Sequence, residues 1–439
     1  MSVGETEEKY GTLIETVLTK YFKYPAFRDR QREVIISVLS GRDTFVLMPT
    51  GAGKSLCFQI PALVLPGVSI VVSPLIALMQ DQVSALKSRK IPSEQYNSSI
   101  SEKEKQRIIQ DLKLKTPNTK LLYVTPEMIA TEGFTYHLTS LHSRGLLGSF
   151  VIDESHCISK WGVGFRPQYR NLCVLKEKFP HVPVIALTAS ATKTVREDIV
   201  KSLSLKNPNV FIASFNRPNI KYFVRFKDLM PNLVNDIVET IRNLKSLLDG
   251  ESSGKAKASK ELEQFCGIVY SHKKSDCDAL AERLRESKLS ATAYHAGLSN
   301  ENRKTVLSDW LSGKVKIVIA TIAFGMGIDK ADVRFVLHHT LSKSLEDFYQ
   351  ESGRAGRDGK AAVSIVYYGA EDRSLMDFLI DKTEEKSKKI HQEAFKGMVD
   401  YCLKASCRRQ NLIEYFGEKN VKCNKTCDFC TDPGKVKNK

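Results

Sequence analysis

The segment MPTGAGKS, residues 48–55, contains the residue types that bind a nucleoside triphosphate. It follows the apolar run 44–48, which predicts a loop between a buried strand and a helix. Backbone N–H groups at positions 51–53 could surround phosphate oxygens, and the start of the helix would favour the same negative charge. Met48 occupies the place of the first glycine in the strict phosphate-loop pattern. A glycine-rich turn with an unrelated Lys-Ser pair is therefore the alternative.

The residues that end this segment and a later acidic pair could complete the chemistry. Lys54 would reach the β- and γ-phosphates, and the Ser55 hydroxyl would be a ligand for Mg²⁺. Asp153 and Glu154 end the apolar run 149–153, where phosphate-loop enzymes place the carboxylate that holds the metal. We expect Asp153 to hold Mg²⁺ and Glu154 to orient or deprotonate the attacking water. An isolated Asp-Glu pair would be a solvated turn, but the phosphate loop upstream favours the catalytic interpretation.

The segment QESGRAGRDGK, residues 350–360, could supply positive charge to the same reaction. Arg354 and Arg357 are three residues apart, so a helix would place both guanidiniums on one face. Such arginines could neutralise charge on the γ-phosphate in the transition state. Without the phosphate loop, both would be taken as surface residues.

The cysteines near the end of the chain have metal-ligand spacing. Cys407, Cys423, Cys427 and Cys430 form the pattern C-x15-C-x3-C-x2-C. Four thiolates suit a structural Zn²⁺ ion in tetrahedral geometry, and disulfides are the less favoured alternative in a reducing compartment. We expect Cys402 to be a helix-face residue. The remaining cysteines lie in apolar contexts and are expected to be reduced core thiols: Cys57, Cys157, Cys173, Cys266 and Cys277.

Two series of buried strands must position these groups. Short apolar runs that alternate with helix-like stretches predict doubly wound parallel sheets, and thus two α/β lobes in tandem. The polar stretch 246–264 predicts a loop or linker. From about residue 371 the chain is helical and polar, then rich in cysteine. The predicted strands are 44–48, 69–73, 120–124, 149–153 and 184–188, then 267–271, 291–295, 315–321, 333–339 and 362–368.

The charge balance favours a polyanionic partner. Lys and Arg number 66 against 50 Asp and Glu, which gives a net charge of +16. Such a surplus favours nucleic acid, although a generally basic soluble protein remains the alternative. The polar, acidic N-terminus does not resemble a signal peptide, and no apolar run approaches the length of a membrane span. We therefore expect an intracellular, reducing location and no membrane partner.

At this point the residues resemble the RecQ family of superfamily-two DNA helicases, over about residues 21–430. The last two motifs of the following series are together highly specific for that family. The resemblance is carried by FKYPAFRDRQ 22–31, SPLIALMQDQ 73–82, YVTPE 123–127, DESH 153–156, TASAT 188–192, FNRPNI 215–220, AYHAGL 293–298, ATIAFGMGIDK 320–330 and QESGRAGRDG 350–359.

The resemblance implies an ATP site in which an aromatic ring and an arginine sandwich the adenine and a glutamine hydrogen-bonds it. Lys23 stands where the family usually has glycine. The implied nucleotide-binding residues are Tyr24, Arg28, Gln31, Thr50, Gly51, Ala52, Gly53, Lys54 and Ser55. The implied catalytic residues are Lys54, Asp153, Glu154, Gln350, Arg354 and Arg357, with Arg357 as the preferred arginine finger.

The family also has an aromatic-rich loop after its metal acids, which corresponds to residues 159–169. Bases of single-stranded DNA stack on such residues with about 1–3 kcal/mol per base. His156 is a plausible relay between the loop and Glu154. Val163 and Gly164 replace the His-Asp pair of the family, so we predict weaker stimulation of ATP hydrolysis by DNA. Ser159, Gly162, Pro167 and Tyr169 match the loop pattern, and the implied DNA contacts are Asn97, Ser98, Trp161, Phe165, Arg166 and Thr321.

Together these observations predict two RecA-like lobes, residues 1–213 and 214–370, and a helical zinc-binding module at 371–439. The predicted activity is that of an ATP-dependent DNA helicase that uses ATP, Mg²⁺ and Zn²⁺, and the family resemblance alone implies a 3′-to-5′ polarity. We expect a short form without a winged helix, with a role in DNA repair or recombination, in the nucleus if the cell is eukaryotic. The rivals are an RNA-dependent ATPase and a non-catalytic DNA-binding adaptor. Protein partners, oligomeric state and preferred DNA structure are not predicted.

Overall fold

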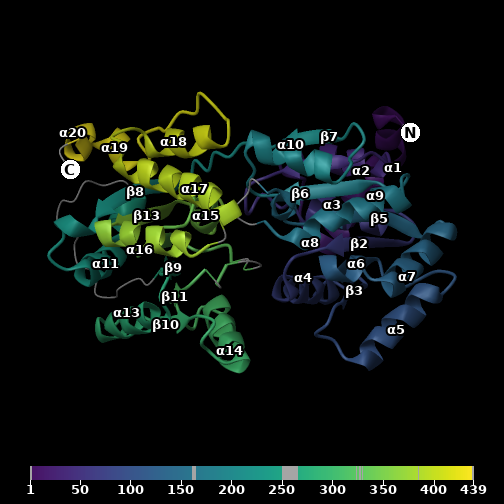
Figure 1. Cartoon of the computed structure of the whole chain (residues 1–439), viewed down its shortest axis with the longest axis horizontal. Coiled ribbons are helices and arrows are strands. Elements are labelled where there is room, and N and C mark those ends of the chain that lie inside the picture. The colour runs from purple at the N-terminus through teal and green to yellow at the C-terminus, as the bar shows by residue number, and fades with distance from the viewer. Residues whose placement is uncertain are drawn as a thin grey trace. The chain divides into compact units, whose positions relative to one another are not determined.

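The computed structural model describes residues 2–160, 165–249, 265–322, 324–325, 328, 330–383 and 385–437. Its internal contacts divide the chain into two compact units, Met1–Ser214 and Phe215–Lys439. Each unit is built on its own parallel sheet, and each is described separately below (Figure 1).

In the described part of the first unit, seven parallel strands form one sheet in the order β3-β4-β2-β5-β6-β1-β7. Because all strands are parallel, their carboxyl ends share one edge, where ligands bind in α/β sheets. The phosphate loop follows β1 and the acidic pair follows β5 at that edge. The strands are β1 Thr44–Leu47, β2 Val68–Val72, β3 Ser93–Tyr96, β4 Leu121–Val124, β5 Leu147–Ile152, β6 Val184–Thr188 and β7 Asn209–Ile212.

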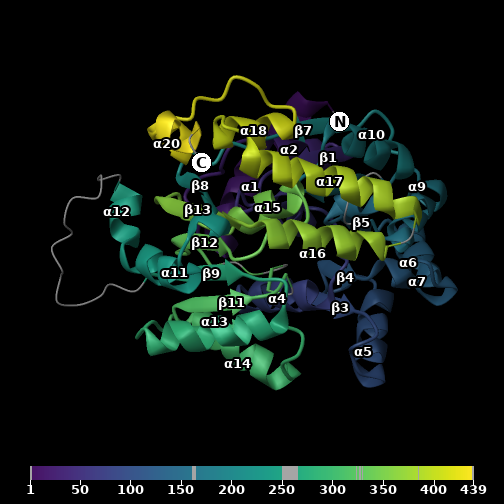
Figure 2. The same cartoon turned by 60° about the vertical axis from the view of Figure 1, so that its left-hand side comes forward.

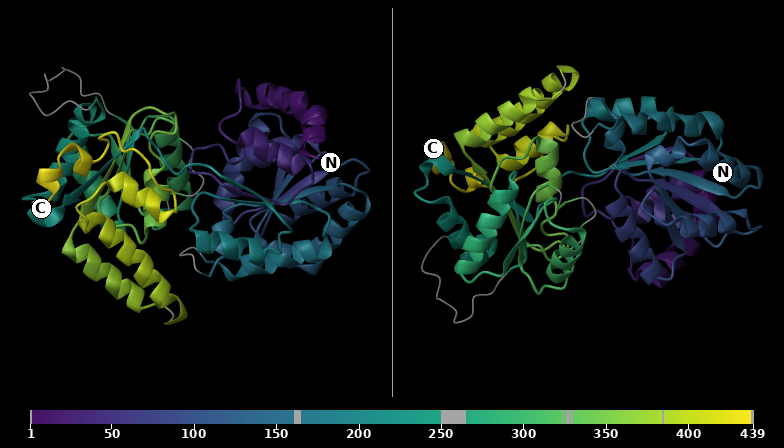
Figure 3. Two further views of the ribbon diagram at one scale, coloured as in Figure 1. Left: turned by 90° about the horizontal axis from the view of Figure 1, so that it is seen from above. Right: turned by 60° about the horizontal axis from the view of Figure 1, so that its bottom comes forward.

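Helices cover both faces of this sheet (Figure 3). On one face, Val46, Val71 and Val151 pack into a core with side chains of α1 to α4. Side chains alternate across a strand, so the runs are apolar throughout because both faces are buried. The helices are α1 Val3–Val17, η1 Leu18–Phe22, α2 Gln31–Leu39, α3 Leu56–Val64, α4 Ile76–Ser88, α5 Glu102–Lys113, α6 Pro126–Ile129, α7 Glu132–Ser143, η2 Ser155–Ile158, α8 Pro167–Arg170, η3 Asn171–Cys173, α9 Val174–Lys178 and α10 Lys193–Ser202.

In the described part of the second unit, six parallel strands form a sheet in the order β10-β11-β9-β12-β13-β8. This order can be followed from β8 to β11 in Figure 2. The edge strand β8 comes first in the chain, before the strands with which it shares the sheet. The strands are β8 Ile220–Phe226, β9 Gly267–Tyr270, β10 Ala291–Tyr294, β11 Ile317–Ala320, β12 Phe335–His338 and β13 Ala362–Tyr368.

The cysteine-rich end of the chain packs within the second unit. Helices α16 and α17 lie side by side as a hairpin (Figures 2 and 3), and α17 contacts α15 and α18. Helices α18 and α19 both contact the edge strand β8. The helices are η4 Lys227–Leu229, α11 Leu233–Arg242, α12 Leu244–Asp249, α13 Lys274–Glu286, α14 Asn300–Leu311, α15 Leu345–Ser352, α16 Ala370–Asp381, α17 Glu385–Leu403, α18 Arg408–Tyr415, α19 Asp428–Thr431 and α20 Pro433–Lys437.

The predicted fold class is confirmed, and each predicted run overlaps an observed strand. The sequence prediction missed β3, β7 and β8. All three are edge strands whose residues are only partly buried, so they lack a continuous apolar run. Most of the predicted loop 246–264 lies outside the described residues. Among the helices that the structure describes, none combines the length and the apolar character needed to cross a membrane.

Candidate active site and metal centre

The phosphate loop connects β1 to α3 and depends on its glycines. Gly51 and Gly53 both have φ of +84°, in the left-handed region that favours glycine. A Cβ atom at Gly53 would lie 2.4 Å from Nε2 of Gln31. Met48 is 1% exposed and its N–H donates to the carbonyl of Thr188 at 3.1 Å. Met48 therefore continues the strand into the core, which explains why this position is not a glycine.

The residues matched to the adenine motif contact the phosphate loop. Gln31 is buried, and its Nε2 donates to the carbonyls of Ala52 at 3.2 Å and Gly53 at 3.0 Å. Its Oε1 accepts from the N–H of Arg28, whose Nη1 donates to the carbonyl of Gly51 at 2.9 Å. The two motifs, separated in sequence, thus form one hydrogen-bonded structure.

The remaining adenine-motif residue, Tyr24, is 42% exposed, so one face of its ring is available for stacking. Lys23 precedes it and has φ of +61°, which is a left-handed conformation. A glycine adopts this conformation without strain, which accounts for the glycine that the family usually has there. The lysine keeps the same turn in this chain.

Asp153 follows β5 and is buried, with 7% of its surface exposed. Its Oδ1 accepts from the N–H of Glu154 at 3.0 Å, and its Oδ2 accepts from Nε2 of Gln82 at 3.4 Å. Burial and the charge of Glu154 raise the pKa of Asp153 to about 6, while the charge of Lys54 opposes that rise. The lysine of the phosphate loop and the carboxylate are therefore close enough to interact.

Glu154 lies beside His156, whose ring contacts the TASAT segment. Its backbone has φ of +49°, and its Oε2 lies 3.3 Å from Nδ1 of His156. The same Nδ1 lies 3.0 Å from Oγ1 of Thr188, which donates to the carbonyl of Ser190. Burial lowers the pKa of His156, but interactions with Cys157 and with Glu154 outweigh burial and raise that pKa. His156 thus occupies the relay position beside Glu154.

The aromatic-rich loop is anchored at both ends. On the N-terminal side, Oγ of Ser159 donates to Asp198 at 2.8 Å, and on the C-terminal side Nη1 of Arg166 donates to the carbonyl of Pro74 at 2.9 Å. Tyr169 is fully buried and its hydroxyl donates to the carbonyl of Asp153 at 3.1 Å. Ser159 and Tyr169 therefore anchor the loop. Trp161, Gly162, Val163 and Gly164 lie outside the described residues.

The other implied DNA contacts differ in exposure. Asn97 is fully buried, and its Oδ1 accepts from the N–H of Ser99 at 2.9 Å, so it shapes this turn, and its contact with DNA stays a prediction. Ser98 is exposed beside it, and Phe165 and Arg166 are half-buried. In the second unit, Thr321 follows β11 and is half-buried.

The arginine segment of the second unit is not helical. Helix α15 carries the half-buried Gln350 and ends at Ser352, and residues 353–358 form consecutive turns, which we call the arginine turn. The helix that would have placed both arginines on one face is therefore not formed. Arg354 is buried, whereas Arg357 is half-buried and its Nη1 donates to the carbonyl of Ile328 at 2.8 Å.

Sequence reasoning missed several residues that hold these groups. Gln82 donates to Asp153 and accepts from the hydroxyl of Tyr123. The sequence around these residues gave no sign of that contact. Asp198 anchors the aromatic-rich loop, and Arg217 donates to three carbonyls of the arginine turn. Gln82 and Arg217 stand in motifs already noted, but only the fold shows which groups they contact.

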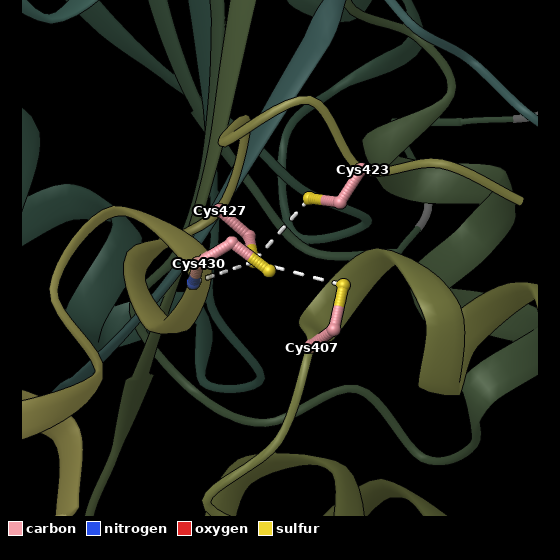
Figure 4. A group of neighbouring side chains, drawn as sticks. All are labelled: Cys407, Cys423, Cys427 and Cys430. Atoms are coloured by element: carbon pink, nitrogen blue, oxygen red, sulfur yellow. Dashed lines mark hydrogen bonds between the residues drawn. The ribbon is translucent and has the colours of Figure 1, made fainter.

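The four predicted cysteine ligands converge (Figure 4), with their ligand atoms all within 4.8 Å of one another. The Sγ atom of Cys427 lies 3.5 Å from that of Cys423 and 3.9 Å from that of Cys407. Sulfur atoms around tetrahedral zinc are about 3.8 Å apart, given Zn–S bonds of about 2.3 Å. All four thiols are free, so the residues fit a structural zinc ion. Cys402 is buried in α17, outside this group.

Three family models match consecutive parts of the chain. A DEAD/DEAH box helicase model matches residues 28–198, a helicase conserved C-terminal domain model matches 241–359, and a RecQ zinc-binding model matches 370–431.

Solved structures share the fold. The Mycobacterium smegmatis helicase Lhr, bound to single-stranded DNA and AMP-PNP, has a TM-score of 0.59 at 20% identity, covering 87% of this chain and 49% of Lhr. Dbp5 of S. cerevisiae, bound to RNA and ADP BeF3, has a TM-score of 0.57 at 16% identity, covering 86% and 96%.

Curated relatives are much more similar in sequence. ATP-dependent DNA helicase Q5 of Rattus norvegicus is 43% identical over 97% of this chain and 44% of its own length. ATP-dependent DNA helicase RecQ of Pasteurella multocida is 42% identical over 95% of this chain and 62% of its own length. The chain thus spans 44% and 62% of the lengths of these two relatives. With the helicase models, the zinc-binding model and these relatives all in agreement, the chain belongs to the RecQ family.

Proposed function

We propose that this chain is an ATP-dependent DNA helicase that couples hydrolysis of Mg-ATP to movement along single-stranded DNA in the 3′-to-5′ direction. The observation that carries the proposal is that the phosphate loop with Lys54 follows β1 and the buried Asp153 follows β5, at the same edge of one parallel sheet. The names of the 42–43% identical relatives support DNA as the track. The polarity follows the family resemblance.

In the proposed reaction, a water oxygen attacks the γ-phosphorus while the bond to the β–γ bridging oxygen breaks and ADP leaves. Glu154 accepts the proton of that water, and His156 at 3.3 Å holds its carboxylate. Lys54 neutralises the phosphate oxygens, and Arg357 stabilises charge that develops in the transition state. Ser55 and Asp153 would hold Mg²⁺, which supplies further neutralisation of the phosphate charge.

Substrate binding follows from the same groups. Tyr24, Arg28 and Gln31 recognise adenine, and Thr50 with the loop residues encloses the phosphates. Phe165, Arg166, Ser98 and Thr321 contact single-stranded DNA, together with Trp161. The hydrogen bond from Tyr169 to the carbonyl of Asp153 supports a coupling between this DNA and the hydrolytic site, because one residue joins the loop to the metal acid.

The test is ATP hydrolysis by the zinc-loaded chain with single-stranded DNA or RNA, and unwinding of duplexes that carry a 3′ or a 5′ tail. We expect DNA to stimulate turnover and the 3′-tailed duplex to be unwound. Turnover that only RNA stimulates would establish the RNA-dependent rival, and absence of turnover with any nucleic acid would favour the adaptor. We further propose a role in DNA repair or recombination, inside a reducing compartment and in the nucleus if the cell is eukaryotic.

A further inference from the structure

We propose that Arg409, in the zinc-binding module, is a positioning residue for the arginine turn. It would act through the segment 215–220, which we call the anchor segment. This inference rests on the proposed ATPase function, because it concerns how the arginine that stabilises the transition state is placed. Every step of the argument lies within the second unit and uses hydrogen bonds between buried or half-buried groups.

The anchor segment holds the arginine turn directly. Nη1 of Arg217 donates to the carbonyl of Gly353 at 3.2 Å, and its Nη2 donates to the carbonyls of Ala355 and Gly356, both at 3.0 Å. Nδ2 of Asn219 donates to the carbonyl of Gly356 at 2.8 Å. The turn belongs to no helix or strand. These side-chain bonds therefore hold it together with backbone hydrogen bonds such as that from the N–H of Gly356 to the carbonyl of Val333.

Arg409 in turn holds the anchor segment. It is 1% exposed, and its Nη1 donates to Oδ1 of Asn216 at 2.9 Å and to the carbonyl of Arg217 at 2.7 Å. Its Nη2 donates to the carbonyl of Ile220 at 2.5 Å. These acceptors lie on both sides of Arg217 and at its own carbonyl, and the guanidinium of Arg217 holds the arginine turn. A shift of Arg409 would therefore shift the backbone of Arg217.

The zinc cluster holds the other side of Arg409. Both Nε and Nη2 of Arg409 donate to Oγ1 of Thr426, at 3.1 and 2.7 Å. Thr426 lies between the ligands Cys423 and Cys427, and its carbonyl accepts from the N–H of Tyr222 in β8 at 3.1 Å. Binding of a metal by the two cysteines would fix this threonine. Figure 1 shows α18 and α19 next to β8, where these contacts occur.

The chemistry of the site requires an arginine. Burying a guanidinium is costly unless its donors are satisfied, and each nitrogen of Arg409 has a hydrogen-bond acceptor. Lysine has a single nitrogen and cannot reproduce this planar arrangement. A purely structural role would predict only a loss of stability on substitution. A positioning role predicts a selective loss of transition-state stabilisation, because a displacement of about 1 Å can cost about 10²-fold in rate.

The neighbouring Arg408 provides a matched control. It lies on the same helix and is also 1% exposed. Its Nε donates to Asp428 at 3.0 Å, and its Nη1 donates to the carbonyls of Tyr401 and Lys404, both at 2.8 Å. These partners lie in the zinc-binding module itself. Loss of Arg408 should therefore weaken the module without the specific effect on the arginine turn.

The experiment compares Arg409→Gln with Arg408→Gln in the full, zinc-loaded chain. For Arg409→Gln we expect kcat and the affinity for ADP with fluoroaluminate to fall by about 10- to 100-fold. The affinity for ADP alone should stay within roughly twofold, because the first unit binds it. Hydrogen–deuterium exchange in the peptide covering 353–358 should accelerate. Arg408→Gln should lower the melting temperature but leave kcat within roughly threefold of the wild-type value.

Two results would overturn the inference. One is a folded, zinc-replete Arg409→Gln variant with wild-type kcat and wild-type exchange at 353–358, and the other is an equal selective loss in Arg408→Gln. If Arg409→Gln does not fold, Thr426→Val removes the acceptor for Nε and must show the same losses in smaller measure. A wild-type chain that hydrolyses no ATP would instead refute the proposed function. In that case hydrogen–deuterium exchange alone would still decide the positioning role.

Discussion

The two units share a parallel-sheet architecture, but they hold their candidate catalytic residues in different ways. In the first unit, the groups stand directly at strand ends, with Asp153 after β5 and the phosphate loop after β1. In the second unit, the arginine turn is held by Arg217, 136 to 139 residues earlier in the chain. Arg409 in turn donates hydrogen bonds to residues of the anchor segment that precede it by 189 to 193 positions.

Substitutions should therefore act differently in the two units. In the first unit the glycine conformations and the strand ends define the geometry, so removal of a catalytic side chain removes chemistry locally. In the second unit the same chemistry depends on distant residues that touch no substrate. We therefore expect the second unit to contain more positions at which a substitution impairs the rate without altering nucleotide binding.

The largest effect should come from Arg357→Ala. An arginine finger contributes about 10³-fold or more to turnover, so kcat should fall by about 10³-fold while the affinity for ATP changes little. Single-turnover hydrolysis and equilibrium nucleotide binding measure the two quantities. Arg354→Ala, in contrast, should lower the melting temperature of the protein, because Arg354 is buried. The exposed Arg283→Ala in α13 is the control, and a loss below tenfold in Arg357→Ala would exclude Arg357 as the finger.

Lys54→Ala tests the first unit. Its ammonium donates to the carbonyl of Met48 at 3.0 Å and interacts with Asp153, so the substitution removes charge from the phosphate site. We expect kcat/KM for ATP to fall by about 10²- to 10³-fold. Lys103→Ala, on the exposed side of α5, should behave as the wild type. If Lys54→Ala retains turnover, the phosphate loop does not serve hydrolysis.

A smaller effect concerns the pH dependence of magnesium binding. The pKa of Asp153 is raised to about 6, so its carboxylate gains a proton as the pH falls through 6, and a protonated carboxyl group does not bind Mg²⁺. From pH 7.5 to 5.5 the ionised fraction drops roughly fourfold, and Mg²⁺-dependent affinity for a non-hydrolysable ATP analogue should drop with it. Phosphate protonation affects every variant equally, so Asp153→Asn is the control. Parallel pH profiles for the two proteins would contradict the assignment.

The smallest effect concerns the aromatic-rich loop. Changing Val163→His together with Gly164→Asp should restore one polar interaction of the family. We expect the stimulation of ATP hydrolysis by single-stranded DNA to rise roughly threefold, with basal hydrolysis unchanged. The measurement is the ratio of turnover with and without DNA. Strong stimulation in the unmodified chain that this double substitution does not increase would contradict the prediction.

Much of the site could be predicted because its signals are local. The glycines and Lys54, the acidic pair after an apolar run, and the cysteine spacing each specify a chemistry within a short stretch. The cysteines converge as expected. The exposure of residues near the strand ends was less predictable. Asn97, which the family resemblance implies as a DNA contact, is fully buried, and its sequence motif gives no sign of this.

The two parallel sheets, the phosphate loop and the metal ligands could be read from local patterns, because apolar periodicity, glycine conformation and ligand spacing act over a few residues. The turn that carries the arginines and the contact of Gln82 with Asp153 became visible only in the folded chain. The same holds for the path from Thr426 through Arg409 to Arg217. Buried hydrogen bonds between distant segments depend on which surfaces meet when the chain folds, and no local pattern encodes that choice.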